Sequence, residues 1–381
     1  GRLCGLGGCR EKLTQNERPI MNVIRIQGEP ERYQGIYYEY DRDSTPLGEG
    51  GMGRIYQGFR VDEMSNFRIY VAIKEIRDDM ARDPQLIERA MRESSIQIVH
   101  ENLLRMYGFV SNVEYDPLHD ANIVRYYMIM ERLVGVNLDQ VLKGVTTDKS
   151  GMQIPFAQEL YELYNTDRDT AVIRIMRGVL SGIMALHEKG YIHRDIDPSN
   201  IMVTIDGKIK LIDFGVCKHI EANVQEKKLT SAGSFLGKVN YAAPELALGD
   251  IQHQNRTTDI YALGILIYQL CVGHLPFSGS DQEVLAAQVS KKVPVGDILN
   301  KDIRKIVEKA TQKQQSKRYQ NGAEFIVDLE RVHPRTKTGR TNAGNMNAQS
   351  YELNSSAIAW WLWPVTALAG LAVGLLLNIV F

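Results

Sequence analysis

The chain has 381 residues, of which 44% are hydrophobic and 24% are charged, a composition typical of a globular protein with one large domain or two moderate ones. Its 45 basic and 46 acidic residues give a net charge of -1, so the charge balance does not favour a nucleic acid as a partner. The 4 cysteines are too few and too scattered for a disulfide framework, which suits a reducing compartment.

Residues 1–32 show no sustained hydrophobic period and are predicted to be a leader before the folded domain. This stretch lacks the apolar core of a secretory signal, and it begins with Gly1 rather than Met, as a fragment or a processed chain would. Cys4 and Cys9 flank a glycine-rich turn. They are either half of a zinc knuckle or two free thiols, because two cysteines cannot complete a four-ligand site.

Residues 33–333 are predicted to form one α+β domain with two lobes. Aromatic and β-branched residues alternate between residues 33 and 75, which predicts consecutive antiparallel strands, and YGFVSNV and RYYMIMERLV predict two more. Residues 84–99 have the pattern of a helix that opens with a proline. Beyond residue 137 the pattern is helical over residues 171–189, 257–273, 280–290, 301–312 and 322–332. A β-rich part with one main helix and a helical part together indicate a bilobal fold.

Residues 334–356 are polar and are predicted to be a linker, whereas residues 357–381 carry no charge and have three tryptophans at one end. At about 1.5 Å per residue the latter segment reaches about 37 Å, enough to cross a hydrocarbon core of about 30 Å. We therefore expect a C-terminal transmembrane helix in a lipid bilayer, the alternative being a buried core helix. The tryptophans fit the interface belt of a membrane.

The basic residues upstream of this helix predict its orientation. Positive charge before the apolar segment favours a single-pass protein whose bulk is cytoplasmic; the residues are Arg331, Arg335, Lys337 and Arg340. Gly370 and Gly374 form a GxxxG pattern, which would allow two helices to pack closely in a homodimer. Glycines are common in membrane spans, so the same pattern also occurs without dimerisation.

A glycine-rich segment, LGEGGMGRIY, lies at residues 47–56. Glycines at positions 48, 50 and 53 let the backbone amides of a hairpin approach phosphate without a Cβ in the way. A dinucleotide-binding fold uses the same spacing, but there a helix follows the glycines, whereas here residues 54–60 have the pattern of a strand. A second strand, VAIK, ends in Lys74.

Polar residues with metal and proton chemistry follow in two loops. In IHRDIDPSN, Asp195 and Asn200 lie five residues apart, which lets a carboxylate receive a hydroxyl proton while an amide binds a metal. In IKLIDFG, Asp213 ends a short strand, where it can hold magnesium. The segments YAAPE, at residues 241–245, and TDIYALG, which contains Asp259, come next.

These motifs, in this order and at these spacings, resemble the protein kinase superfamily over residues 45–333, and in particular bacterial serine/threonine kinases that are anchored in a membrane. The resemblance implies ATP and Mg²⁺ as cofactors and the hydroxyl groups of protein substrates as acceptors. It also implies that Lys74 contacts the α- and β-phosphates and is held by Glu93, with Glu88 as the alternative. Asp195 would orient the substrate hydroxyl, while Asn200 and Asp213 would hold Mg²⁺.

The remaining nucleotide contacts follow from the same resemblance. Ala72 and Met202 would enclose the adenine, Met130 would be the gatekeeper, and Glu131 and Leu133 would supply hinge hydrogen bonds. The phosphates would be covered by the loop of Leu47, Gly48, Glu49, Gly50, Gly51, Met52, Gly53, Arg54 and Ile55. Glu245 and Arg318 resemble a buried pair whose role is structural.

Two positions depart from the pattern of the family's serine/threonine members. A lysine usually stands two residues after the catalytic Asp, and here that residue is Asp197. A threonine usually follows the glycine of the substrate-binding loop, and here it is Lys238. Loss of the usual lysine would remove a positive charge from the transition state, so a weakly active kinase or an inactive membrane scaffold is the alternative function. An exchange of charge between these two positions, with Lys238 paired to Asp197, would preserve activity instead.

Control and substrate class are also implied by the resemblance. Arg194 would bind a phosphate on the loop that contains Thr230, Ser231 and Ser234, the alternative being an ordinary polar loop. DIDPSN keeps the proline of the serine/threonine pattern and lacks the arginine of the tyrosine pattern, which favours serine and threonine as acceptors. We also expect the chain to autophosphorylate and to signal at the membrane. Small-molecule kinases share the catalytic Asp and the metal ligands, but they normally lack the APE segment and the long activation loop that are present here.

Overall fold

The computed structural model describes residues 22–116, 120–214, 217–219 and 238–334. The chain divides into two units, Gly1–Arg335 and Thr336–Phe381. The second unit lies outside the described residues, as do most of the predicted linker, the predicted transmembrane helix, the two N-terminal cysteines and the proposed phosphorylation sites.

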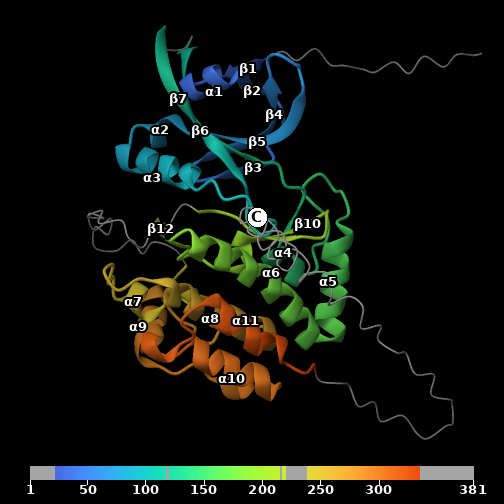
Figure 1. Cartoon of the computed structure of the whole chain (residues 1–381), viewed down its shortest axis with the longest axis vertical. Coiled ribbons are helices and arrows are strands. Elements are labelled where there is room, and N and C mark those ends of the chain that lie inside the picture. The colour runs from blue at the N-terminus through green and yellow to red at the C-terminus, as the bar shows by residue number, and fades with distance from the viewer. Residues whose placement is uncertain (1–21, 117–119, 215–216, 220–237, 335–381) are drawn as a thin grey trace, which may run out of the picture. The chain divides into compact units, whose positions relative to one another are not determined.

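One antiparallel sheet forms the N-terminal part of the first unit (Figure 1). Its strand order is β1-β2-β4-β5-β7-β6, with β3 paired to β4 outside that order. The strands are β1 (Val23–Ile26), β2 (Ile36–Asp41), β3 (Gly48–Gly50), β4 (Gly53–Asp62), β5 (Arg68–Ile76), β6 (Met106–Asp116) and β7 (Ala121–Glu131). The strands expected between residues 33 and 75 and in the two later segments are confirmed. They could be predicted because alternation with a period of two residues indicates a half-buried strand.

The leader expected at residues 1–32 is too long. Strand β1 pairs with β2 from Val23 to Ile26, and α1 (Glu29–Gln34) follows it, so these residues belong to the folded unit. The strand has 4 residues, the lower limit at which alternation indicates a strand, and the helix has 6, too few for a helical period to be recognised.

Helix α3 (Pro84–Ser95) packs against β6 and β7. Asp83 caps it by accepting a hydrogen bond from the Gln85 backbone N–H, and Pro84 occupies the first turn. The helix ends at Ser95 rather than at residue 99 as expected. Ile96, Ile98 and Val99 are β-branched and lose rotamer freedom in a helix, which is a physical reason for the earlier end. A short helix, α2 (Asp78–Ala81), precedes α3.

The C-terminal part of this unit is mainly helical, as Figure 1 shows from green to orange. Its helices are α4 (Leu138–Leu142), α5 (Pro155–Thr166), α6 (Arg168–Glu188), α7 (Pro244–Ala247), α8 (Arg256–Val272), α9 (Asp281–Ser290), α10 (Lys301–Ala310) and α11 (Gly322–Glu330). Five of them match the predicted ranges to within a few residues. Helix α5 was not expected, because its N-cap residue Ile154 offers no capping side chain.

Short strands and turns connect these helices. Strands β8 (Gly135–Asn137), β10 (Ile201–Thr204) and β11 (Ile209–Leu211) form a small sheet, and β9 (Tyr191–Ile192) pairs with β12 (Lys218–His219). The 3-10 turns are η1 (Pro198–Asn200), η2 (Val239–Tyr241), η3 (Val295–Asp297) and η4 (Gln315–Lys317).

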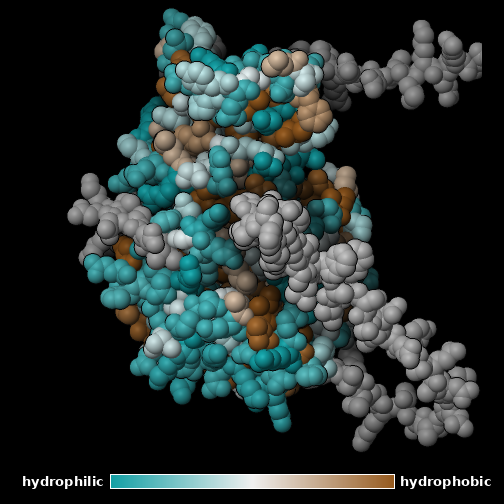
Figure 2. Space-filling model, in the orientation of Figure 1, coloured by the Kyte–Doolittle hydropathy of each residue, from teal (hydrophilic) through white to brown (hydrophobic). Residues whose placement is uncertain are grey.

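A large apolar cluster runs from one face of the main sheet into the helical part. On β5, Ala72 and Ile76 belong to this cluster, whereas Val71 and Ile73 belong to a smaller cluster on the other face. Because side chains alternate along a strand, Lys74 lies on the face shared with Ala72 and Ile76. In the described part of the chain, α6 alone is long and apolar enough to cross a membrane, and most of its apolar stretch is buried in the protein. Figure 2 shows that the visible surface of the helical part is mainly hydrophilic.

Candidate active site

The glycine-rich segment forms a tight hairpin between β3 and β4. Gly50 faces Gly53 across the turn, and Glu49 faces Arg54, with which it forms an exposed ion pair of 3.1 Å. A Cβ on Gly53 would lie 2.0 Å from the backbone oxygen of Glu75, so the packing of β4 on β5 requires glycine there. A Cβ on Gly50 would meet no atom within 4 Å. Glycine at position 50 is therefore not needed for the packing of the protein itself.

The other members of this loop have different environments. Leu47 is exposed, and Gly51, like Gly50, has open space around it. Met52 and Ile55 are partly buried and pack against the large apolar cluster. The loop thus combines an apolar underside with an open turn.

Lys74 and Glu93 come from different elements, β5 and α3. Glu93 is 6% exposed, and burial, followed by the negative charge of Asp213, raises the pKa of Glu93 to about 7. The charge of Lys74 and a hydrogen bond from the Phe214 backbone N–H oppose this shift. The two side chains therefore interact electrostatically, although no ion pair within 4.0 Å joins them in the described structure. Glu88, the alternative, is exposed and pairs with Arg92 at 3.1 Å.

Asp195 and Asn200 are joined directly. The Asn200 side-chain amide donates to Asp195 Oδ2 at 2.9 Å and to the Asp195 backbone oxygen at 3.0 Å. The pKa of Asp195 is raised by burial and by the negative charges of Asp197 and Asp213, against the influence of His193. A carboxylate whose pKa is raised by other carboxylates lies where a cation would be stabilised.

The β10–β11 hairpin brings Asn200 beside Asp213. Asn200 immediately precedes β10 and Asp213 follows β11 by two residues, while the Ile212 backbone N–H donates to the Asn200 backbone oxygen at 2.9 Å. Carboxylate and amide oxygens are suitable ligands for Mg²⁺, which keeps several waters and takes few protein ligands. The described residues hold no group of three His, Cys, Asp or Glu side chains that would bind a metal alone.

The backbone near these side chains is strained. Asp213 has φ 68° and Arg194 has φ 67°, a left-handed conformation that is uncommon for residues other than glycine. Such strain persists only where surrounding contacts enforce it. Phe214 is 2% exposed, and its ring packs edge-on against the His193 ring, with 6.0 Å between the ring centroids. The residue after Asp213 is therefore fixed in the core.

Asp259 anchors the loop that carries Asp195. It is fully buried and accepts hydrogen bonds from the backbone N–H groups of His193 and Arg194, each at 2.8 Å, and from His187 Nε2 at 2.7 Å. Although burial alone would raise it, the pKa of Asp259 is held below its usual value by these partners. The motif of Asp259 was recognised in the sequence, but this role and both histidines were missed, because the contacts span more than sixty residues of chain.

The two unusual residues also meet. Lys238 Nζ lies 2.5 Å from Asp197 Oδ1 and 2.6 Å from Ser199 Oγ. Its backbone N–H donates to Asp195 Oδ1 at 3.1 Å. The pairing expected from the sequence between positions 197 and 238 is confirmed.

The expected adenine contacts lie where the main sheet meets the helical part. Ala72 is buried and faces Met130 in the pairing of β5 with β7, and Met202 is partly buried on β10. The Glu131 backbone N–H donates to the Arg105 backbone oxygen at 2.8 Å, so this N–H is already engaged within the protein. The Glu131 side chain is held by the buried Lys210 at 3.0 Å, a positioning contact that sequence motifs did not indicate. Leu133 is partly buried and packs on the large apolar cluster.

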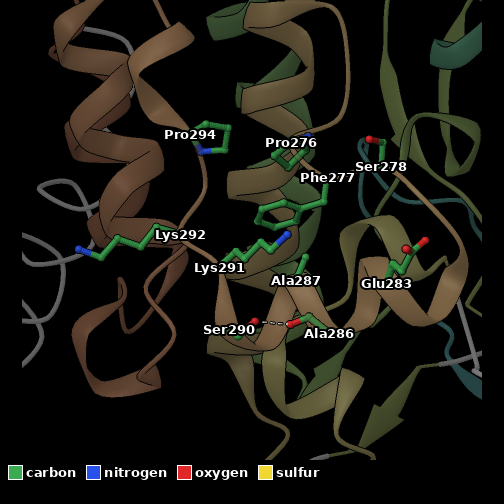
Figure 3. A pocket seen from close by; sticks show the side chains of 10 residues that line it. All are labelled: Pro276, Phe277, Ser278, Glu283, Ala286, Ala287, Ser290, Lys291, Lys292 and Pro294. Atoms are coloured by element: carbon green, nitrogen blue, oxygen red, sulfur yellow. Dashed lines mark hydrogen bonds between the residues drawn. The ribbon is translucent and has the colours of Figure 1, made fainter.

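A separate hollow lies away from these residues. It has a volume of about 570 Å³ and is formed by α9 and the segments on either side of it, with Pro276, Phe277, Ala287, Lys291 and Pro294 among its lining (Figure 3). The hollow is lined by two hydroxyl side chains, Ser278 and Ser290. The Ser290 hydroxyl donates to the Ala286 backbone oxygen at 2.7 Å. None of the expected site residues lines it, so we do not assign the chemistry to this hollow.

Comparison with known proteins points to the same chemistry. A family model described as protein kinase domain matches residues 42–334. The chain is 29% identical to a probable serine/threonine-protein kinase PknB of Lactococcus lactis, over 77% of this chain and 42% of that protein. It is 30% identical to a probable serine/threonine-protein kinase PknB of Corynebacterium glutamicum, over 77% of this chain and 42% of that protein. It is 28% identical to the serine/threonine-protein kinase PknB of Mycobacterium tuberculosis, over 75% of this chain and 42% of that protein.

The matched region spans about two fifths of the length of these relatives. Within this chain, however, the family match begins directly after β2, extends past the end of α11 and includes every motif on which the kinase resemblance rests. The protein therefore belongs to the protein kinase family.

Proposed function

We propose that the chain is a protein serine/threonine kinase that transfers the γ-phosphate of ATP to protein hydroxyl groups. The observation that carries the proposal is the convergence of Asp195, Asn200 and Asp213 through one hydrogen bond and one hairpin. The hydroxyl oxygen attacks the γ-phosphorus, its proton passes to Asp195, and the bond to the bridging oxygen breaks to release ADP. Asn200 and Asp213 would hold Mg²⁺, which neutralises phosphate charge when bound.

The other groups bind and orient the nucleotide. Lys74, on the face of β5 that meets the helical part, is placed to contact the phosphates, with the buried Glu93 nearby. The open turn at Gly50 and Gly51 leaves room for the backbone to approach them. Ala72, Met202 and the hinge would enclose the adenine.

The domain boundaries and the membrane anchor belong to the same proposal. The kinase domain extends to residue 333, a polar linker covers residues 334–356, and residues 357–381 cross the bilayer once with the kinase domain in the cytoplasm. Support comes from the absence of charge in the last segment and the basic residues before it. Homodimerisation would use Gly370 and Gly374.

A weakly active kinase fold that acts as a membrane scaffold is the second candidate. The observation in its favour is the separation of Lys74 and Glu93, which form no ion pair within 4.0 Å among the described residues. A phosphotransfer assay with Mg-ATP and a dephosphorylated casein, followed by mapping of the modified residues, separates the two functions. We expect phosphoserine or phosphothreonine on the chain and on casein. Binding of ATP without any transfer would favour the scaffold.

A further inference from the structure

Lys238 contacts the loop of Asp195 through two different groups. Its backbone N–H donates to Asp195 Oδ1 at 3.1 Å, while its ammonium group donates to Asp197 Oδ1 at 2.5 Å and to Ser199 Oγ at 2.6 Å. A single residue from the segment before η2 thus holds both carboxylates of this loop.

Asp197 is buried so deeply that it needs a cation. Its side chain is 1% exposed, and Oδ1 accepts a further hydrogen bond of 2.7 Å from the Ser199 backbone N–H. Its Oδ2 is buried without a hydrogen-bond partner in the described structure. An ionised carboxylate in such a position is strongly destabilising unless an opposite charge compensates for it. The ammonium of Lys238 provides that charge.

Lys238 is not buried with its partner. Its side chain is 48% exposed, so the ammonium lies at the boundary between the buried carboxylate and the solvent beside Asp195. Burying the ammonium as well would add its own desolvation cost to that of the carboxylate. The geometry instead leaves a positive charge, anchored on one side by Asp197, close to the carboxylate that receives the substrate proton.

We propose, on the basis of the proposed kinase function, that Lys238 supplies and Asp197 positions the positive charge that stabilises the phosphoryl group during transfer. Charge accumulates on the phosphoryl oxygens in the transition state, and a fixed cation stabilises it there more than in the ground state. Asp197 acts through Lys238 and is a positioning residue. It holds the long, flexible lysine side chain in one orientation.

The test measures kcat and KM for ATP with the full-length chain in detergent, with casein as acceptor. Lys238→Met is expected to lower kcat about a hundredfold while KM for ATP changes little, because the lost contact forms mainly in the transition state. Lys238→Arg is expected to recover a substantial part of kcat, since it keeps the charge. Ser199→Ala keeps the ion pair and is expected to lose only a few-fold.

Lys208→Met is the matched control. Lys208 has a side chain that is 40% exposed and forms an ion pair with Glu101, so its loss reproduces the surface change without touching Asp195. We expect its kcat to equal that of the wild type. Thermal unfolding of every variant establishes that it is folded at the assay temperature.

The exchange of the two residues tests whether they act together. Asp197→Lys and Lys238→Thr are each expected to lower kcat strongly, and the double variant is expected to recover much of the loss, because the cation then comes from the other side of the same contact. Wild-type kcat in folded Lys238→Met, or strictly additive losses in the exchange, would overturn the inference. An inactive wild type would instead remove the proposed function itself, so the two failures are distinguishable.

Discussion

Arg318 and Glu245 form a two-bond ion pair inside the helical part. Arg318 Nη1 lies 2.8 Å from Glu245 Oε1, Nη2 lies 2.9 Å from Oε2, and the arginine side chain has no exposed surface. The guanidinium also donates to the backbone oxygens of Gln312, Thr257 and Lys313. The arginine joins the turn before α11 to α7 and α8.

Replacement of this arginine should destabilise the fold. Arg318→Met leaves Glu245 as an uncompensated charge in the interior, and we expect it to lower the free energy of unfolding by about 3–5 kcal/mol. Arg177→Met, which breaks the exposed pair with Glu330, should lower it by less than about 1 kcal/mol. Denaturant unfolding of both variants checks the difference, and equal effects would contradict a structural role for the buried pair.

The raised pKa of Glu93 should make the free energy of unfolding depend on pH. Its pKa of about 7 in the folded protein lies above the unfolded value, so its contribution to stability is present at low pH and is lost as the pH rises through 7. Glu93→Gln removes this charge, and we expect it to raise the free energy of unfolding at pH 8 by about 2 kcal/mol, with a much smaller gain at pH 5.

The same substitution should lower phosphotransfer, because Gln cannot attract Lys74. Glu88→Gln is the control: that side chain is exposed, so neither stability nor turnover should change appreciably at either pH. Denaturant unfolding at both pH values measures the effect on stability. A Glu93→Gln variant that is less stable than the wild type at pH 8 would show that the charged form is favoured instead.

Asp195→Ala and Asp213→Ala should each abolish phosphotransfer, for different reasons. The first would remove the proposed proton acceptor, whereas the second would remove a proposed metal ligand and should also weaken the binding of Mg-ATP. Turnover and equilibrium binding of a fluorescent ATP analogue with Mg²⁺ separate the two effects. Asp281→Ala, in the exposed first turn of α9, is expected to match the wild type. Near wild-type turnover in either active-site variant would refute the assigned roles.

Deletion of residues 357–381 should release the protein from membranes and leave its turnover unchanged, since the proposed polar linker would separate the segment from the folded unit. Fractionation with an alkaline carbonate wash measures the first effect and the casein assay the second. Recovery of the full-length chain in the soluble fraction without detergent would exclude a spanning helix.

Much of the site was predictable because its chemistry is local in sequence. Asp195 and Asn200 lie five residues apart, and their spacing alone indicates that they share a loop. The glycines of the β3–β4 hairpin likewise lie within a few residues of one another. The pairing of Lys238 with Asp197 was predictable because both positions departed from the family pattern in complementary ways.

Other features depend on contacts between distant segments and could not be deduced. Nothing near Asp259 in sequence indicates that it accepts hydrogen bonds from two backbone groups and from His187. The support of Glu131 by Lys210 is of the same kind. Helix α5 and the short β1 were missed for a different reason. Helix α5 lacks a capping side chain at its N-cap position, and β1 has only 4 residues, the lower limit at which alternation indicates a strand.

The glycines of the hairpin are constrained for two different reasons. Gly53 is required by the backbone of β5, because any side chain would meet the Glu75 carbonyl, whereas Gly50 and Gly51 face open space. A library randomised at the three positions and selected only for a folded protein should therefore retain Gly53 and diversify the other two. The same library selected for phosphotransfer should retain all three glycines. Positions that are conserved only in the second selection are those that nucleotide binding, rather than folding, requires to be glycine.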